Sequence, residues 1–195
     1  MRHRPLIIGL VGLAGTGKST AARMILKDHS FELMRLGDGI RDALKAKGWA
    51  QTPENERRVQ LSIREQHGMA ALVKLSAPEI RSSLSKGSSV LIDSMCSFSE
   101  RECLQEIAGD VVVYIVAVHA PLERRLLQLR TRHERPLSPV QMEQRDLLEL
   151  DHLEKGKLLA LADHHLLNDG ALEALEHDVG LLMQLVVATK RTEQG

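Results

Sequence analysis

The feature that most constrains the fold is the stretch GLAGTGKST, residues 12–20, which directly follows the apolar run LIIGLV. Gly12, Gly17, Lys18 and Ser19 match the pattern G-x-x-x-x-G-K-[ST], whose context is a strand before it and a helix after it. The glycines allow a tight turn in which successive N–H groups face phosphate oxygens, and the N-terminus of the following helix adds positive charge. The stretch therefore predicts a phosphate-binding loop for a nucleotide.

This loop also predicts the cofactors. Lys18 is expected to neutralise the β- and γ-phosphates of ATP, and the Ser19 hydroxyl is expected to ligate Mg²⁺. The residues that we expect to contact the nucleotide from this loop are Gly12, Ala14, Gly15, Thr16, Gly17, Lys18, Ser19 and Thr20.

The rest of the chain alternates between two kinds of segment. Runs rich in β-branched and apolar residues alternate with stretches of helical periodicity, which is typical of a parallel sheet covered by helices on both faces. The expected strands are Pro5–Val11, Phe31–Leu36, Ser89–Asp93, Val111–His119 and His164–Leu167. Helix starts are predicted by Thr52-Pro53 and Ser138-Pro139, and by the capping-box pairs Ser97 with Glu100 and Ser138 with Gln141. No repeat or low-complexity linker interrupts the 195 residues, so we expect one α/β domain.

Composition excludes several classes of partner. The 26 basic residues balance the 26 acidic residues, so no strong field for nucleic acid or anionic lipid is expected. No apolar run approaches the ~20 residues that span a bilayer. The two cysteines, Cys96 and Cys103, fit a reduced compartment better than a disulfide scaffold. We expect a soluble, cytoplasmic protein without a nucleic-acid or membrane partner, and the oligomeric state stays open.

Two acidic motifs follow expected strands. VLID ends in Asp93, an acid placed to hold Mg²⁺ or its water, although a helix-capping role is the alternative. RLGDGIR places Asp38 and Arg41 one helical turn apart, so that Arg41 can grip an acceptor phosphate while Asp38 orients or deprotonates an acceptor. No Glu follows Asp93 and no N-K-x-D motif occurs, which argues against a mechanical ATPase and a GTPase switch.

Two longer segments could move over a ligand. Residues 38–86 are too long for a simple crossover and are expected to hold several helices that form an acceptor-binding insertion. Residues 131–151 are charged and rich in arginine, and they are read either as a lid or as a solvated helical hairpin.

The order of these motifs resembles the nucleoside monophosphate kinase superfamily of P-loop kinases. Gly37, Asp38 and Arg41 match the G-D-x-x-R of adenylate kinases. The likeness is greatest to small adenylate-kinase-like and dephospho-CoA-kinase-like proteins, which share TPEN, VHAP and A-D-x-x-x-x-N-x-G-x-L-E, here residues 52–55, 118–121 and 162–173. The resemblance spans Ile7 to Val179 and implies a three-layer fold, with a five-stranded parallel sheet in the order 2-3-1-4-5, a helical acceptor flap and a lid.

The resemblance also implies roles for single residues. Arg132, Arg135 and Arg145 resemble lid arginines that offset charge on the transferred phosphoryl group. Asn168 and Gly170 resemble residues of the loop that touches the adenine of the donor. Together with Lys18, Asp38 and Asp93, the three arginines form the expected catalytic set.

One departure bears on the acceptor. Related kinases usually read D-G-I-R after the third strand, whereas this chain reads DSMC, with Ser94 replacing the glycine and Cys96 replacing the arginine. A thiol cannot replace a forked cation. The first expectation is Mg·ATP-dependent phosphoryl transfer to a small nucleotide-like acceptor. The alternatives are a kinase for a hydroxyl acceptor such as dephospho-CoA, and an ATP-binding regulatory protein with little turnover.

Overall fold

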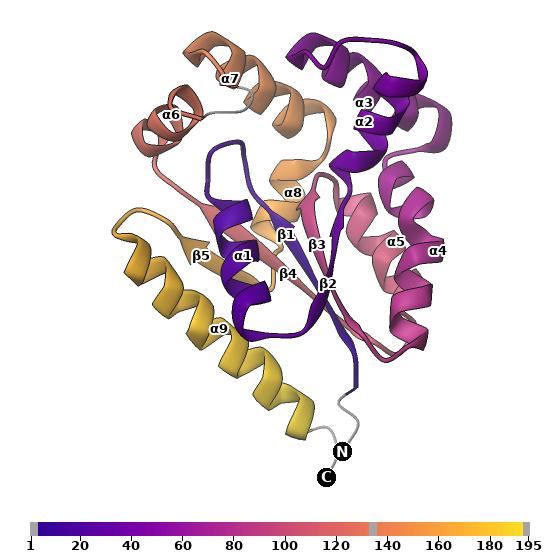
Figure 1. Ribbon diagram of the computed structural model, residues 1–195, viewed down its shortest axis with the longest axis vertical. Coiled ribbons are helices and arrows are strands. Elements are labelled where there is room, and N and C mark those ends of the chain that lie inside the picture. The colour runs from indigo at the N-terminus through magenta and orange to yellow at the C-terminus, as the bar shows by residue number, and fades with distance from the viewer. Residues whose placement is uncertain (1–3, 133–135, 193–195) are drawn as a thin grey trace.

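The computed structural model describes residues 4–132 and 136–192 of the chain (Figure 1). Five strands alternate with helices along these residues. The strands are β1 (Leu6–Val11), β2 (Phe31–Arg35), β3 (Ser89–Met95), β4 (Val112–His119) and β5 (His164–Leu167). The helices are α1 (Lys18–Asp28), α2 (Gly37–Ala46), α3 (Pro53–His67), α4 (Ala71–Ser85), α5 (Phe98–Ala108), α6 (Leu122–Arg130), α7 (Pro139–Leu147), the π-helical turn η1 (Leu148–His152), α8 (Lys155–Ala160) and α9 (Leu172–Thr192).

The five strands form one parallel sheet in the order β2-β3-β1-β4-β5, which confirms the predicted topology. Each predicted strand is present, with ends that differ by at most two residues from those expected. The central strand β1 is buried along its whole length, between β3 and β4. Its position explains why this strand reads as a continuous apolar run.

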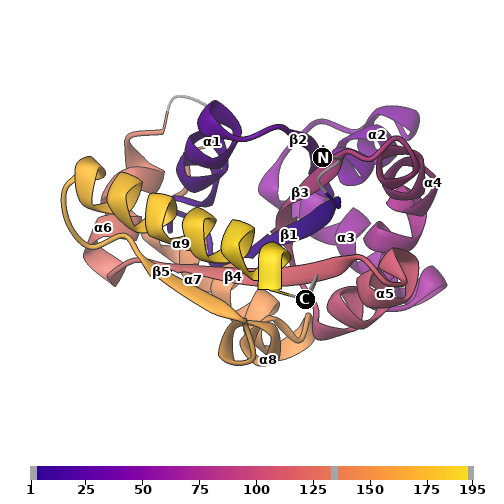
Figure 2. The same ribbon diagram turned by 90° about the horizontal axis from the view of Figure 1, so that it is seen from below.

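Alternate side chains of the sheet enter two separate cores. Leu6, Ile8 and Leu10 of β1 pack with α1 and α9 on one face, while Ile7 and Val11 pack with α4, α5 and α8 on the other. Figure 2 shows α1 and α8 on opposite sides of the strands. The fold is therefore a three-layer α/β sandwich, as the period of two along each strand requires.

The predicted helix starts are confirmed by their caps. The Thr52 hydroxyl accepts a hydrogen bond from the Asn55 N–H at the start of α3. Ser97 and Ser138 each form a full capping box, with Glu100 at the start of α5 and Gln141 at the start of α7. These caps satisfy amide groups that have no partner within their own helix.

The segment 38–86 is helical, and its helices divide between two places. Helix α4 contributes Leu72, Val73 and Ile80 to the core beside β3 and α5. Helices α2 and α3 lie at the end of the sheet where β1 leads into the phosphate loop (Figure 1). Within the described residues, no helix is long and apolar enough to cross a membrane.

Candidate active site

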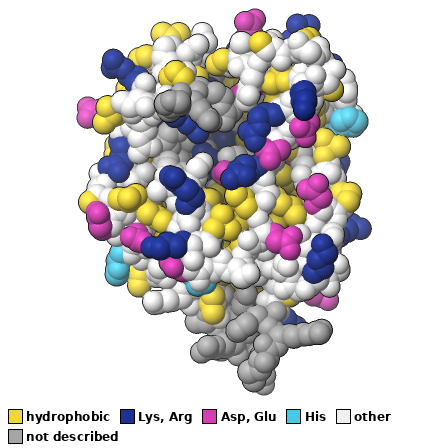
Figure 3. Space-filling view, viewed as in Figure 1, with side chains coloured by type: hydrophobic (Ala, Val, Ile, Leu, Met, Phe, Trp, Pro, Cys, Tyr) yellow, Lys and Arg dark blue, Asp and Glu magenta, His cyan; other side chains and the backbone are white. Residues whose placement is uncertain are grey.

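The residues singled out from the sequence gather at one edge of the sheet. All five strands are parallel, so their carboxyl ends meet there. β1 leads into the loop of residues 12–17, β2 leads toward Asp38, and β5 leads into Asn168. Asp93 and Ser94 lie near the carboxyl end of β3. Figure 3 shows a hollow in the upper part of the molecule, bordered by Lys and Arg side chains. Ligands of open α/β sheets bind at such an edge, so we take it as the candidate active site.

The phosphate loop is packed so tightly that two of its glycines have no room for a side chain. A Cβ atom at Gly12 would lie 2.5 Å from the Val118 carbonyl oxygen. Gly17 has a φ of +97°, and a Cβ atom there would lie 2.3 Å from the Asn168 amide nitrogen. The backbone thus takes a path that only glycine allows, and α1 begins directly after it at Lys18. This geometry is the one that presents backbone N–H groups to an anion.

Lys18 is held against the backbone of the same loop. Its Nζ donates hydrogen bonds to the carbonyl oxygens of Gly12 at 2.8 Å and Leu13 at 2.9 Å. Burial and the charge of Lys155 lower the pKa of Lys18 to about 8, while Glu149 raises it. Asp93 and Arg145 also interact electrostatically with this ammonium group. A cation at this point is therefore poised to bind an anionic ligand.

Asp93 and Ser94 lie near the carboxyl end of β3, the strand that pairs with β1. Asp93 is 8% exposed, and the Ser94 hydroxyl donates a hydrogen bond of 3.0 Å to its Oδ1 atom. Ser94 has a φ of +70°, a left-handed conformation that glycine adopts without strain. The backbone at this position thus keeps the shape of the glycine that related kinases carry, although this chain has a serine.

The donor set fits Mg²⁺ carried by a nucleotide. Ser19 and Asp93 supply the hydroxyl and carboxylate oxygens that this hard cation prefers. No group of three or more His, Cys, Asp or Glu side chains in the described part of the chain could hold a metal by itself. That pattern suits Mg²⁺, which is usually bound through one or two protein oxygens together with substrate phosphates.

Asn168 joins the phosphate loop to the far side of the sheet. It is 4% exposed, and its Nδ2 group donates a hydrogen bond of 2.9 Å to the Thr16 carbonyl oxygen. Its backbone N–H donates to the His119 carbonyl oxygen at the end of β4. Gly170 is exposed in the turn that follows β5. The structure thus gives Asn168 a contact with the loop itself, in addition to the adenine contact that the resemblance implies.

On the opposite side of the loop, Asp38 and Arg41 lie in α2. They form an ion pair through Asp38 Oδ1 and Arg41 Nη2, with about half of the Asp38 side chain exposed. The sequence placed these two residues on one face of a helix, and in the structure each faces the other. The pair stands at the carboxyl end of β2, next to the end of β3.

Cys96, which directly follows β3, is buried. Its Sγ atom lies 3.7 Å from Gln60 Nε2 of α3, and its backbone N–H donates to Glu100 Oε2 at 2.6 Å. Glu100 also accepts a hydrogen bond from Arg64 of α3, with both side chains buried. Burial raises the pKa of Glu100 and Arg64 opposes this effect. Arg64 is therefore committed to tying α3 to the start of α5.

A second buried ion pair joins Glu149, near the end of the predicted lid, to Lys155 in α8. Lys155 Nζ donates to Glu149 Oε2 at 2.7 Å and approaches the Gly12 carbonyl oxygen at 3.4 Å. The other carboxylate oxygen, Glu149 Oε1, accepts a hydrogen bond of 2.9 Å from Arg145 Nε. Burial raises the pKa of Glu149, but Lys155 and Arg145 outweigh it and lower the pKa to about 2. The carboxylate is therefore ionised between two cations.

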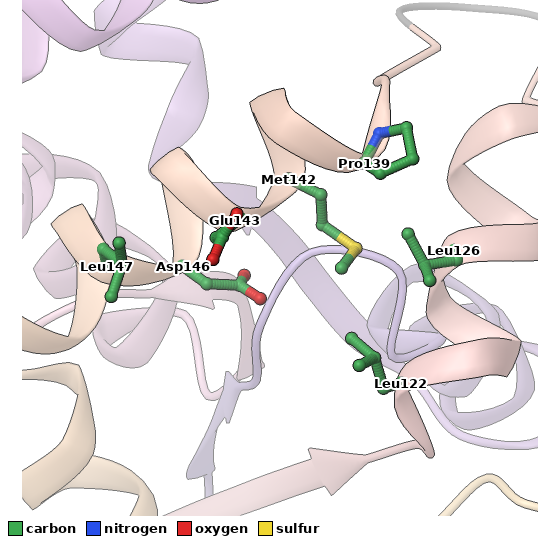
Figure 4. A pocket seen from close by; sticks show the side chains of 7 residues that line it. All are labelled: Leu122, Leu126, Pro139, Met142, Glu143, Asp146 and Leu147. Atoms are coloured by element: carbon green, nitrogen blue, oxygen red, sulfur yellow. The ribbon is translucent and has the colours of Figure 1, made fainter.

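Arg125 makes another connection to the loop. Its Nε group donates to the Ala14 carbonyl oxygen at 2.8 Å, and its Nη2 group lies 2.7 and 2.6 Å from the two Asp146 oxygens. An aliphatic groove of about 330 Å³ runs between α6 and α7 at this point, with Asp146 at its lining (Figure 4). The remaining lining residues are Leu122, Leu126, Pro139, Met142, Glu143 and Leu147.

The predicted lid arginines differ in their surroundings. Arg145 is anchored by Glu149, whereas Arg132 is exposed after α6, and Arg135 lies outside the described residues. Sequence reasoning missed Arg125, Glu149 and Lys155. The spacing of Arg145 and Glu149 by four residues was the one available sign, and it is equally typical of an exposed helical pair.

Comparison of the sequence with known proteins relates the chain to two families. A family model described as an AAA domain matches residues 11–143. A UPF0200 protein from Aeropyrum pernix is 37% identical over 175 residues, or 89% of each chain. One from Hyperthermus butylicus is 35% identical over 184 residues, or 93% of this chain and 94% of the relative.

Solved structures show the same fold. A gluconokinase from Sinorhizobium meliloti superposes with a TM-score of 0.63 over all of both chains, at 14% sequence identity. A shikimate kinase from Acinetobacter baumannii superposes with a TM-score of 0.57 over 96% of each chain, at 18% identity. The fold is therefore the one that these small kinases share, as the motifs indicated. By sequence, the chain belongs to the AAA-domain family, whose model covers more than half of it, and to the UPF0200 proteins.

Proposed function

We propose that this protein is a kinase that transfers the γ-phosphoryl group of Mg·ATP to a hydroxyl group of a small, nucleotide-like molecule. The observation that carries the kinase proposal is the convergence of Asp93, Arg145 and the phosphate loop on Lys18. Lys18 and the loop amides would bind the phosphates, and Ser19 and Asp93 would hold Mg²⁺. When bound, Mg·ATP supplies the phosphoryl group and its charge neutralisation.

The choice of a hydroxyl acceptor rests on the cations of the acceptor side. Arg41 is paired with Asp38, and Arg64 is buried against Glu100. Cys96 stands where related kinases carry an arginine. A monophosphate acceptor needs cations that are available to its oxygens, because a charge-assisted hydrogen bond is formed with each of them. A hydroxyl acceptor needs a general base, and the candidate is the half-exposed Asp38 carboxylate, which lies just after β2 in the first turn of α2.

Two further observations bear on the acceptor. The gluconokinase and the shikimate kinase that share the fold are named for small hydroxyl-bearing molecules, which supports the same class here. The match of Gly37, Asp38 and Arg41 to adenylate kinases favours a nucleotide-like acceptor. Dephospho-CoA satisfies both conditions, since it is a nucleotide derivative with a free ribose hydroxyl. A nucleoside monophosphate acceptor is the second candidate, because Arg41 could leave Asp38 for a phosphate.

A screen for ADP release tests the proposal. The protein is incubated with Mg·ATP and, one at a time, dephospho-CoA, nucleosides, nucleoside monophosphates, shikimate and gluconate. We expect acceptor-dependent ADP release with a hydroxyl acceptor, and none in Lys18→Ala. Turnover with monophosphates alone would replace the hydroxyl proposal with the second candidate. Tight binding of Mg·ATP without turnover on any acceptor would instead support a regulatory ATP-binding protein.

A further inference from the structure

A continuous chain of polar contacts connects the phosphate loop to Arg145. It runs from the Gly12 carbonyl oxygen to Lys155 Nζ, then to the Glu149 carboxylate and finally to Arg145 Nε. The Glu149 and Lys155 side chains are 2% and 3% exposed, whereas Arg145 is 46% exposed. The buried part of the chain therefore ends in a side chain that faces solvent at the edge of the site.

The two buried members of this chain sit at irregular points of the backbone. Glu149 lies in η1, a π-helical turn, and such turns are frequent at functional sites. Lys155 follows Glu154, which has a φ of +56°. The Glu154 carboxylate accepts hydrogen bonds from the backbone N–H and hydroxyl of Ser99, which fixes the start of α8 on α5. Strained backbone persists where the surrounding contacts determine it, and here it lies next to Lys155 of the buried pair.

The nitrogen atoms of the Arg145 guanidinium group differ in their contacts. Nε donates to Glu149, while the Nη groups make no hydrogen bond with any other described residue. Each oxygen of Glu149 accepts a hydrogen bond from a cation, which restricts rotation of the carboxylate and so the direction of the Arg145 Nε–H group that donates to it. A planar guanidinium group fixed at Nε has its Nη groups aimed in a defined direction.

We infer that Glu149 and Lys155 are positioning residues that hold Arg145 in a fixed orientation relative to the phosphate loop. This inference rests on the proposed function, together with the role on the transferred phosphoryl group that the family resemblance implies for Arg145. An arginine that is already oriented contributes to the transition state without first losing its conformational freedom. Arg145 is then held in place before the donor binds, by contacts that begin at the phosphate loop.

A double-mutant cycle on turnover separates positioning from a merely structural role. Glu149→Gln/Lys155→Met removes both charges at nearly constant volume, a replacement that buried ion pairs often tolerate. We expect kcat to fall about 10- to 100-fold, the range typical of a misplaced catalytic group. The KM for ATP should change less than about three-fold, since the lost interaction is made in the transition state. Added to Arg145→Ala, the pair variant should cause no further loss.

Controls and opposing outcomes are defined by the same measurements. Glu176→Gln breaks an exposed Lys27–Glu176 ion pair by the same chemistry and should leave kcat and KM unchanged. Multiplication of the two kcat losses in the triple variant, or a parental kcat in the pair variant, would overturn the inference. If the pair variant does not fold, Glu149→Asp takes its place, because it keeps the charge but withdraws the carboxylate from Arg145.

A measurement that needs no turnover separates this inference from the proposed function. The Nε–H of Arg145 is observed by NMR in protein labelled with ¹⁵N-arginine and is assigned by its loss in Arg145→Lys. We expect slow hydrogen exchange at this group in the parent and in Glu176→Gln, and fast exchange in Glu149→Gln/Lys155→Met. Equal exchange in all three proteins would refute the positioning, whatever the ADP-release screen shows.

Discussion

The side-chain amide of Asn168 donates a hydrogen bond of 2.9 Å to the carbonyl oxygen of Thr16, 152 residues away in the sequence. The same amide nitrogen occupies the space that a side chain at Gly17 would need. Asn168 therefore braces the phosphate loop from behind, on the side where β5 ends. The loop is thus contacted by a residue that directly follows β5, the last strand of the sheet in the sequence.

Replacement of Asn168 by alanine should weaken phosphate binding by the loop. The change leaves the Thr16 carbonyl oxygen without this donor, so we expect the affinity for Mg·ATP to fall about ten-fold, or ~1.4 kcal/mol. Calorimetric titration with Mg·ATP and with Mg-tripolyphosphate measures the effect. Equal losses for both ligands indicate the brace, whereas a loss for ATP alone would indicate that the adenine contact is what matters.

Lys18→Ala should abolish the stabilisation that Mg·ATP confers. Ligand at 100 times its dissociation constant adds about 2.7 kcal/mol. In a chain of this size, that raises the melting temperature by roughly 5–10 °C. Lys27→Ala, an exposed lysine in the last turn of the same helix, is the matched control and should keep the full shift. An unchanged melting temperature of the parent with saturating Mg·ATP would contradict the kinase proposal.

Asp38→Asn should separate the two acceptor chemistries. Asparagine keeps the shape of the side chain and removes its basicity, so turnover on a hydroxyl acceptor should fall by roughly 10²–10⁴ with KM nearly unchanged. Arg41→Ala is the complementary variant, because it should chiefly raise the KM of a phosphate-bearing acceptor. Steady-state kinetics with the acceptor found by the screen decides the matter. Asp38→Asn with more than about a tenth of parental turnover would exclude Asp38 as the base.

Glu149 should make the stability of the protein sensitive to acid. Its pKa is lowered from 4.5 to about 2 in the folded state, so the folded protein holds this site ionised when the unfolded chain has begun to bind a proton. The resulting stability is complete above about pH 4.5 and is lost as the pH falls toward 2. Urea unfolding at pH 6, 4 and 3 should show a smaller pH dependence for Glu149→Gln than for the parent. Identical slopes would show that Glu149 is not the residue responsible.

Ser94 should prefer glycine to alanine. Its φ of +70° costs a residue with a Cβ atom ~1 kcal/mol, a cost that glycine does not carry. Both substitutions lose the hydrogen bond to Asp93, so this bond cancels in the comparison. We expect Ser94→Gly to be more stable than Ser94→Ala by ~1 kcal/mol in urea unfolding. Greater stability of the alanine variant would mean that the backbone relaxes out of the left-handed conformation.

Much of this fold could be predicted because its determinants are local. The apolar run before Gly12 specified a buried strand, and the capping residues Ser97 and Ser138 marked helix starts that the structure confirms. Parallel strands with right-handed crossovers then brought Asp38 and Asp93 to the same edge. The roles proposed for these residues stay predictions that the variants above address.

The buried charges could not be predicted in the same way. Arg64, Arg125 and Lys155 lie in stretches that read as polar helix surface, yet each is buried against a carboxylate. Arg132 and Arg145 looked alike as lid arginines, but only Arg145 has Glu149 beside it among the described residues. The ion pairs of Arg64, Arg125 and Lys155 join residues of different helical segments, so the sequence pattern around each of these cations does not identify its partner.

The sequence by itself determined the strands, the phosphate loop and the edge of the sheet that carries the candidate active site. These follow from the period of the apolar residues, from the glycine pattern of residues 12–17 and from the chirality of the crossovers, all of which can be read along the chain. Only the tertiary structure decided that Asn168 braces Thr16 and that Lys155 and Glu149 hold Arg145. A charged side chain loses its water only when packed elements enclose it, and which partner meets it there is a property of the packing.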